Sequence, residues 1–180
     1  DSFLDSIEQC SPVSIEELRK ASSSDRTKNL SIITSITFHS FTKDCLWGLR
    51  QILHCHHFHL KGLSAMDLHL FLSSFPILAE MWMKTTPNEV NIESLTISDT
   101  PLVPALFNAY LECLPYLRTL HSITILPSPK DKWYLSDAHL IQLVSVLATQ
   151  QCPEFDSLHI PNQRIGVKGI DAFVSLFIRS

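Results

Sequence analysis

The stretch from Phe155 to Phe177 constrains the fold more than any other part of the chain, because its spacing specifies a complete structural unit. Apolar residues occupy the first, fourth and sixth positions of a short strand that begins at Phe155. Gly166 and Gly169 then open a run whose apolar residues recur at helical spacing. The stretch therefore predicts a strand, a turn and a helix. Its apolar residues are Phe155, Leu158, Ile160, Ile165, Ile170, Phe173, Val174 and Phe177.

This unit resembles the ribonuclease-inhibitor type of leucine-rich repeat, whose pattern is LxxLxLxxNxLxxxGxxxLxxxL. Gln163 stands at position nine, where that pattern usually has Asn. The resemblance implies an α/β fold in which the repeats stack into a solenoid. Parallel strands would form the concave face of this solenoid and helices its convex face.

The same template can be laid on residues 29–180 about six times, which predicts a leucine-rich repeat domain of irregular repeats. Between Met81 and Leu95 the interval is too short for a helix, so a tight turn or a misassigned strand is expected there. The long interval from Ile123 to Leu158 is explained by an insertion at 127–134. An α/β sandwich with a few βαβ units is the alternative. The residues at position four are Ile36, Phe58, Met81, Leu95, Ile123 and Leu158.

Residues 1–28 are expected to form an N-terminal helical cap and a polar linker. Ser14 and Glu17 have the spacing of a capping box, and an apolar stripe that includes Ile7 precedes them. Later helices are expected to begin near residues whose side chains can cap a helix. These capping residues are Thr42, Ser64 and Thr100, the last followed by Pro101 at the first helical position.

Charge and cysteine usage limit the partners and the compartment. With 14 basic and 18 acidic residues, the net charge is -4, which argues against nucleic acid as a partner. No apolar run reaches the roughly 20 residues that span a bilayer, so no membrane association is expected. The 5 cysteines are scattered and form no CxxC pair. This pattern is typical of a reduced, intracellular protein, and we expect the cytoplasm, with the nucleus as an alternative.

A binding surface is predicted on the concave sheet, because side chains alternate along each strand. Positions one, four and six would face the core, and positions three, five and seven would face outward. Trp82 is the expected anchor, since exposed aromatic and cationic residues carry much of the binding energy of interfaces. The alternative is that Trp82 is buried. The predicted binding residues are His39, His57, His59, Lys61, Glu80, Trp82, Lys84, Thr96 and His159.

The sequence predicts no metal site, no cofactor and no catalytic residues. In the repeat register, Cys55 at position one would point into the core, whereas His57 and His59 would point outward, so these three side chains are not expected to converge on a metal ion. Neither a GxSxG elbow nor an HExxH helix occurs, and the 4 glycines form no phosphate-binding loop. Asp137 and His139 fall in the first turn of an expected helix, where they are explained by helix capping.

We therefore predict a non-catalytic protein–protein interaction domain of a larger intracellular protein. The resemblance implies a protein partner, which could be another part of the same full-length protein. One alternative is an autoregulatory repeat domain of an innate-immune-receptor-like protein. Another is the substrate-recognition domain of a ubiquitin-ligase adaptor, and a third is an enzyme or metal-dependent domain.

Overall fold

A computed structural model describes residues 7–9, 35–42, 45, 56–85, 92–151 and 154–178. Its strands form one sheet in the order β1-β2-β3-β4-β5-β6, so that strands consecutive in the sequence are neighbours in the sheet. The strands from β2 to β6 are parallel, and β1 is antiparallel to β2. The strands are β1 (Ile7–Gln9), β2 (Ser35–Phe38), β3 (His57–Lys61), β4 (Ser94–Ser98), β5 (Ser122–Ile125) and β6 (Ser157–His159).

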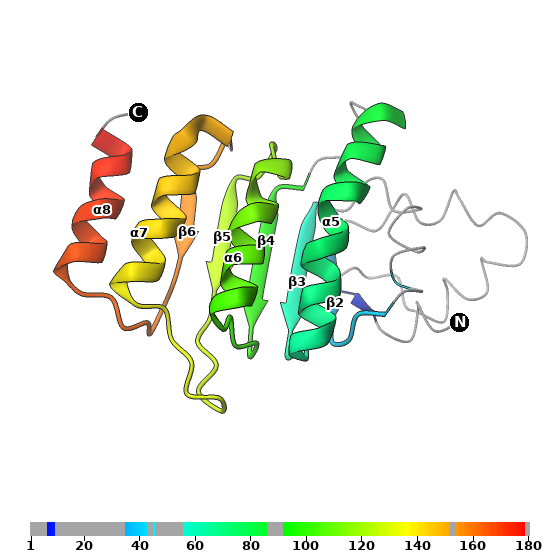
Figure 1. Cartoon of the computed structure of the whole chain (residues 1–180), viewed down its shortest axis with the longest axis horizontal. Helices are drawn as coiled ribbons and strands as arrows, with labels where there is room; N and C mark the ends of the chain where they lie inside the picture. Colours follow the sequence, from blue (N-terminus) through cyan, green and yellow to red (C-terminus); the bar gives the residue numbers. More distant parts are fainter. Residues whose placement is uncertain are drawn as a thin grey trace, which may run out of the picture.

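Helices α5, α6 and α7 connect the strands from β3 to β6, α8 follows β6, and the four helices lie side by side on one face of the sheet (Figure 1). The chain is therefore an α/β protein with a parallel sheet, as its sequence predicts. Among the described residues, no helix has the length and apolar character needed to cross a membrane. The helices are α5 (Ala65–Thr85), α6 (Pro104–Cys113), α7 (Asp137–Val146) and α8 (Val167–Ile178), with a 3₁₀ turn η1 (Leu114–Tyr116) and a π-helical turn η2 (Leu147–Gln151).

One register runs across all five parallel strands. The Cα partners follow the template residue by residue, so Leu95 pairs with Ile123 and Ile123 pairs with Leu158. At the amino end of the three steps from β3 to β6, a single carbonyl oxygen accepts two N–H groups at the start of the next strand. Glu93 O, for example, accepts from His121 N at 2.9 Å and from Ser122 N at 3.0 Å. His56 O and His121 O repeat this arrangement one strand before and one strand after.

The core lies between the sheet and the helices, and its strand residues are those at positions four and six. In β2 to β5 both positions are buried, whereas position four of β6, Leu158, is only partly buried. Aromatic rings fill the core where β2 and β3 pack against α5. The rings of Phe41 and Phe71 meet edge to face with their centroids 5.1 Å apart, and Phe38 stacks on Phe58 with the centroids 6.1 Å apart. Burial of the same two positions explains why the sheet keeps its register.

A turn of fixed geometry follows three of the strands. Gly62, Asp99 and Asn162 stand at position eight of their units and have φ values of 63°, 49° and 55°. Glycine, aspartate and asparagine are the residues that adopt this left-handed conformation most readily. The β5 unit has Pro127 at position eight, where the ring fixes φ at a negative value. There the chain instead enters the expected insertion, whose Ser128 forms an antiparallel bridge with Trp133.

In two units, the residue at position nine ties the turn to the preceding unit. Thr100 is fully buried, and its hydroxyl oxygen accepts the N–H of Leu63 at 3.0 Å and donates to Ser98 O at 2.9 Å. The Nε2 of Gln163 donates a hydrogen bond to Ile125 O at 2.8 Å, and its Oε1 accepts one from the N–H of Leu135 at 2.7 Å. The expectation that Thr100 caps a helix was wrong, because α6 begins at Pro104.

A strand predicted around Met81 and Met83 is also wrong, because α5 continues through these residues. Pro76 inside α5 cannot donate an N–H to the carbonyl of Leu72, which disfavours a helix at this point. The helix continues because its apolar stripe continues on both sides of the proline. The buried residues of this stripe are Leu68, Phe71, Leu72, Phe75 and Ala79.

The N-terminal expectation needs one correction. Ile7–Gln9 form strand β1 rather than part of a helical cap, and they pair with the edge strand β2. An edge strand exposes a row of backbone groups, and β1 covers this row. The rest of the predicted cap, 1–28, lies outside the described residues.

Ile123→Ala should destabilise the chain by roughly 2 to 5 kcal/mol, because it removes a buried side chain from the centre of the sheet. Urea unfolding followed by circular dichroism measures this loss. Thr124→Ala, on the next residue and the opposite face, is the matched control and should change stability by less than about 0.5 kcal/mol. Equal effects of the two substitutions would contradict the assigned faces of β5.

Thr100→Val tests the tie at position nine without changing the volume of the side chain. Leu63 N would lose its buried acceptor, and Ser98 O would lose a donor. We expect a loss of about 1 to 3 kcal/mol in the free energy of unfolding. Thr96→Val, at a partly exposed position of β4, should have little effect. A neutral Thr100→Val would show that the hydrogen bonds of Thr100 do not hold the turn.

Candidate binding face

The face of the sheet opposite the helices, called here the outer face, presents short polar side chains in rows. No described helix covers this face (Figure 1). Because side chains alternate along a strand, positions three and five point to it while positions four and six point to the core. Its residues at positions three and five are Ser35, Thr37, His57, His59, Ser94, Thr96, Ser122, Thr124, Ser157 and His159.

Two histidine–serine pairs link β3 to β4 on the outer face. His57 Nδ1 lies 3.1 Å from Ser94 Oγ, and His59 Nε2 lies 2.7 Å from Ser98 Oγ. Ser98 is buried, His59 is half-buried and His57 is exposed. These bonds hold the imidazole rings in defined orientations, so β3 offers a partner two fixed polar groups at little further cost in side-chain entropy.

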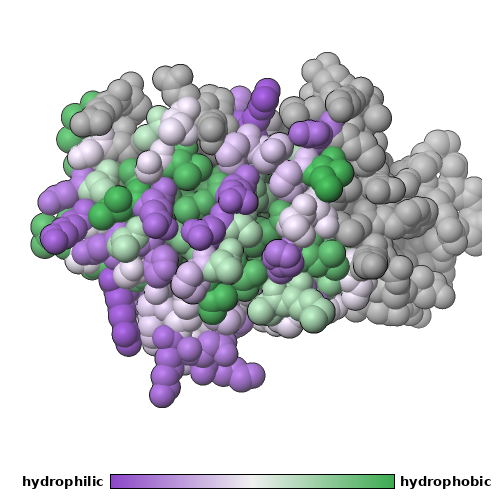
Figure 2. Space-filling view, in the orientation of Figure 1, coloured by the Kyte–Doolittle hydropathy of each residue, from purple (hydrophilic) through white to green (hydrophobic). Residues whose placement is uncertain are grey.

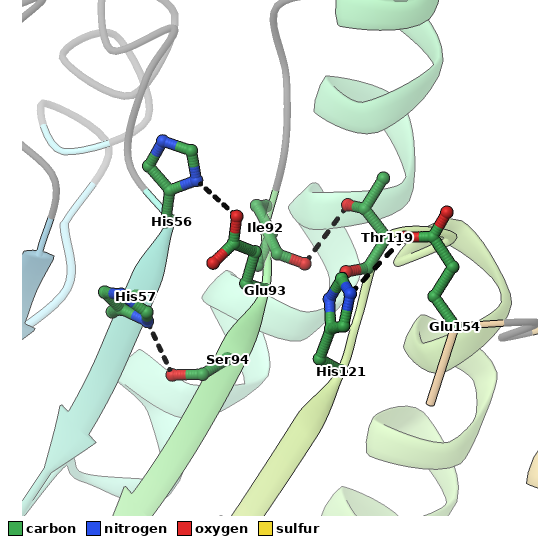
Figure 3. A network of polar contacts seen from close by, with 8 residues as sticks. All are labelled: His56, His57, Ile92, Glu93, Ser94, Thr119, His121 and Glu154. Carbon is green, nitrogen blue, oxygen red and sulfur yellow. Dashed lines mark hydrogen bonds and ion pairs between the residues drawn. The ribbon is translucent and has the colours of Figure 1, made fainter. Parts of the chain in front are cut away.

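A polar row borders the amino ends of the strands (Figure 3). At this end, His56 Nδ1 donates to Glu93 Oε1 at 3.0 Å. His121 Nδ1 donates to Thr119 O at 2.8 Å, while its Nε2 lies 3.6 Å from Glu154 Oε2. A carbonyl oxygen can only accept, so Nδ1 of His121 must carry a hydrogen. The row therefore alternates imidazole and carboxylate groups along the edge of the outer face.

The polar row was not predicted from the sequence, although a signal for it was present. The residues at position two, just before the strands, alternate between histidine and acid as His56, Glu93, His121 and Asp156. This alternation at position two is the sequence signal for the row. Glu154 lies before its strand and has no such pattern.

The structure brings together six of the nine residues that the sequence predicts for binding. His57, His59, Thr96 and His159 belong to strands of the outer face, and Lys61 ends β3 at position seven. His39 follows β2 at the same position and is exposed.

The other three predicted residues, Glu80, Trp82 and Lys84, lie in α5. They were assigned to the sheet through the strand predicted around Met81, and the helix removes them from the outer face. The proposed aromatic anchor is therefore not part of this face, which relies on hydroxyl and imidazole groups instead.

The described residues contain no group of three or more His, Cys, Asp or Glu side chains that could hold a metal ion. Cys55 lies outside the described residues. Hydroxyl and imidazole groups at these spacings can donate and accept hydrogen bonds along the outer face, except at Thr37 of β2, which is buried.

His139 sits where the sequence predicts helix-capping chemistry. Ser136 N donates to His139 Nδ1 at 3.1 Å, and Ser136 Oγ lies 2.9 Å from the same nitrogen. The ring packs edge to face on Phe107 with the centroids 4.8 Å apart. Burial lowers the pKa of His139 below its usual value, since it disfavours the charged ring. The neutral imidazole thus caps the start of α7.

A comparison of the chain with protein-family models, with curated proteins and with solved structures finds no match in any of the three.

Acidification should weaken the cap at His139. A histidine whose pKa is lowered by folding stabilises the native state above its unfolded pKa of about 6.5, and this stabilisation is lost as the pH falls toward the lower folded pKa. Glutamine keeps an acceptor for Ser136 N but does not titrate in this range. Between pH 7.5 and 5.5, the melting temperature of the wild type should therefore fall more than that of His139→Gln. Parallel pH profiles would contradict this role of His139.

Proposed function

We propose that the chain is a leucine-rich-repeat domain of the ribonuclease-inhibitor type, and that it binds a protein partner on its outer face without catalysis. In this proposal, the outer face is the concave surface of a solenoid and the helices form the convex surface. The observation that carries the function is the outer face itself: five parallel strands in one register present polar side chains on the side that no described helix covers.

Three periodic features support the repeat assignment. Positions four and six are buried from β2 to β5, position eight is left-handed in three units, and position nine bonds to the preceding unit at Thr100 and Gln163. In leucine-rich repeats each unit buries its apolar face only against its neighbours, so a stack is stable where a single repeat is not. Gln163, which stands where the family pattern usually has Asn, bonds to Ile125 O and to the N–H of Leu135.

The chemistry of the outer face favours a polypeptide ligand. Its Ser, Thr and His side chains offer both donors and acceptors, which suits the backbone and polar side chains of another protein. The acidic net charge of -4 disfavours a nucleic acid. The 5 cysteines are scattered along the sequence and form no CxxC pair, which supports the proposal of an intracellular compartment.

Affinity capture from a lysate of the native source tests the proposal. Thr96→Arg and Thr124→Arg place bulky cations at the centre of the outer face, where both threonines are half-buried. We expect these variants to lose the partner by at least about tenfold in recovery, equivalent to roughly 1.4 kcal/mol. Glu112→Arg on the exposed surface of α6 is the matched control and should keep the partner.

Circular dichroism must show that the arginine variants remain folded. A partner that is retained by both outer-face variants and lost by Glu112→Arg would place binding on the helices and contradict the proposal.

A further inference from the structure

The outward positions of the parallel strands carry ionisable side chains of one kind. Among the described residues at positions three, five and seven of β2 to β6, every ionisable group is a histidine or a lysine, and none is a carboxylate. The whole chain, by contrast, has 18 acidic and 14 basic residues. Any charge on these rows is therefore positive. The ionisable residues of the rows are His39, His57, His59, Lys61 and His159.

Four of these residues lie together on two neighbouring strands. The Cα pairing of Phe38 with Leu60 places the next residues, His39 and Lys61, side by side. Along β3 the basic residues stand at every second position, about 7 Å apart. We call the four residues the basic block; they are His39, His57, His59 and Lys61.

The side of the molecule that carries the helices has a mixed composition instead. Hydrophilic and apolar side chains intermingle over it (Figure 2). Its exposed charges have both signs, with Glu112 on α6 and with Lys168 and Asp171 on α8. The separation of basic from acidic residues is therefore a property of the outer face.

The hydrogen-bond partners of the histidines on β3 tolerate a protonated ring. Ser94 Oγ lies 3.1 Å from His57 Nδ1, and Ser98 Oγ lies 2.7 Å from His59 Nε2. A hydroxyl oxygen can accept a hydrogen bond as well as donate one, so both pairs survive when the ring gains a proton. His139 is the opposite case, because its Nδ1 accepts a backbone N–H and would lose that bond. The basic block can therefore gain charge without breaking these contacts.

The acids nearest to the basic block stand outside its strands. In the described part of the chain, Glu8 on β1 pairs with Thr37 of β2, Glu93 precedes β4, and Asp99 follows β4. Glu93 already accepts a hydrogen bond from His56 Nδ1 at 3.0 Å. With its three histidines protonated, the basic block holds four positive charges against these three acids, one of which is engaged.

We propose that the basic block binds an extended, acidic segment of the protein partner, and that this binding strengthens as the pH falls from 7.5 to 5.5. The inference rests on the proposed function, because it names the part of the partner that reaches β2 and β3. An extended segment along β3 turns every second side chain toward it at the same interval of about 7 Å. Carboxylates on alternate residues would therefore meet His57, His59 and Lys61 in turn.

The direction of the pH dependence follows from which groups titrate. Histidine is the side chain that most often gains a proton between pH 8 and 5. Aspartate and glutamate ordinarily have pKa values of about 4, so the partner's carboxylates stay charged at pH 5.5. Attraction between the two surfaces therefore increases on acidification.

The rest of the partner would pack on the short hydroxyl side chains of β4 and β5. Arginine in place of Thr124, two strands away from β3, would obstruct this contact by its bulk. The loss expected of the outer-face variants is therefore compatible with an acidic segment on the basic block.

Fluorescence polarisation with a labelled peptide tests the inference on the whole chain. The probe is a peptide of about ten residues that alternates Glu and Ser, long enough to span β3 when extended. Its affinity for the wild type should rise at least about tenfold between pH 7.5 and 5.5. The same peptide with Gln in place of Glu should show no such rise. Added salt should weaken binding of the acidic peptide.

Three variants separate the parts of the basic block. His57→Gln combined with His59→Gln should abolish the rise, because glutamine can bond to serine but cannot gain a proton. Lys61→Gln should weaken binding at both pH values and keep the rise. His69→Gln, on the exposed surface of α5, is the matched control and should change neither. Circular dichroism at pH 5.5 must show that each variant remains folded.

The inference would be overturned by a wild type that does not bind the acidic peptide below about 1 mM at pH 5.5, or that binds it equally at both pH values. A double histidine variant that keeps the rise would do the same. So would an oligonucleotide of equal charge that binds as tightly, since the block would then attract any polyanion. Each of these outcomes leaves the proposed function intact if Thr124→Arg still loses the partner in affinity capture.

Discussion

Burial of the same two apolar positions in successive strands is the constraint on which the rest of the structure depends. A slip of one residue in any strand would turn Ile123 and Ile125, or their equivalents, from the core to the outer face. The pairing register of the strands is therefore fixed, and it determines where the other periodic features stand in each unit. The position-eight turns, the position-nine ties and the polar row all stand at fixed distances from these buried residues.

The same constraint explains why the two faces of the sheet differ so sharply. The helices cover the side on which positions four and six lie, and the remaining positions are free to carry Ser, Thr and His. Such a face contributes little to stability, so its sequence can serve recognition. The histidine–serine pairs and the hydrogen bond between His56 and Glu93 fix the orientation of side chains that hydrophobic packing does not hold.

Much of this sheet could be predicted from the sequence, because strands with one buried face have a two-residue period that is local and readable. Ile36, Phe58, Leu95, Ile123 and Leu158 were assigned to one position and do share one register. The insertion at 127–134 was predicted from interval length alone. Ser64 was expected to start a helix, and its hydroxyl accepts the N–H of Asp67 at 3.1 Å.

The failures have physical causes. The short run around Met81 was interpreted as a strand, yet Phe75 and Ala79 extend the buried stripe of α5 past Pro76 and outweigh the cost of the proline. Strand β1 is only three residues long and is specified by its pairing with β2, a contact that no local pattern reveals. Glu80, Trp82 and Lys84 were placed on the outer face through the first of these errors.

The central claim is that β4, β5 and β6 lie parallel in the register that pairs Leu95 with Ile123 and Ile123 with Leu158. Interstrand nuclear Overhauser effects in an isotope-labelled sample test it most directly. The structure predicts contacts between amide and Hα protons of neighbouring strands at these pairs, without the short Hα–Hα contacts of antiparallel strands. Strong Hα–Hα contacts between β4 and β5, or contacts displaced by one residue, would contradict it.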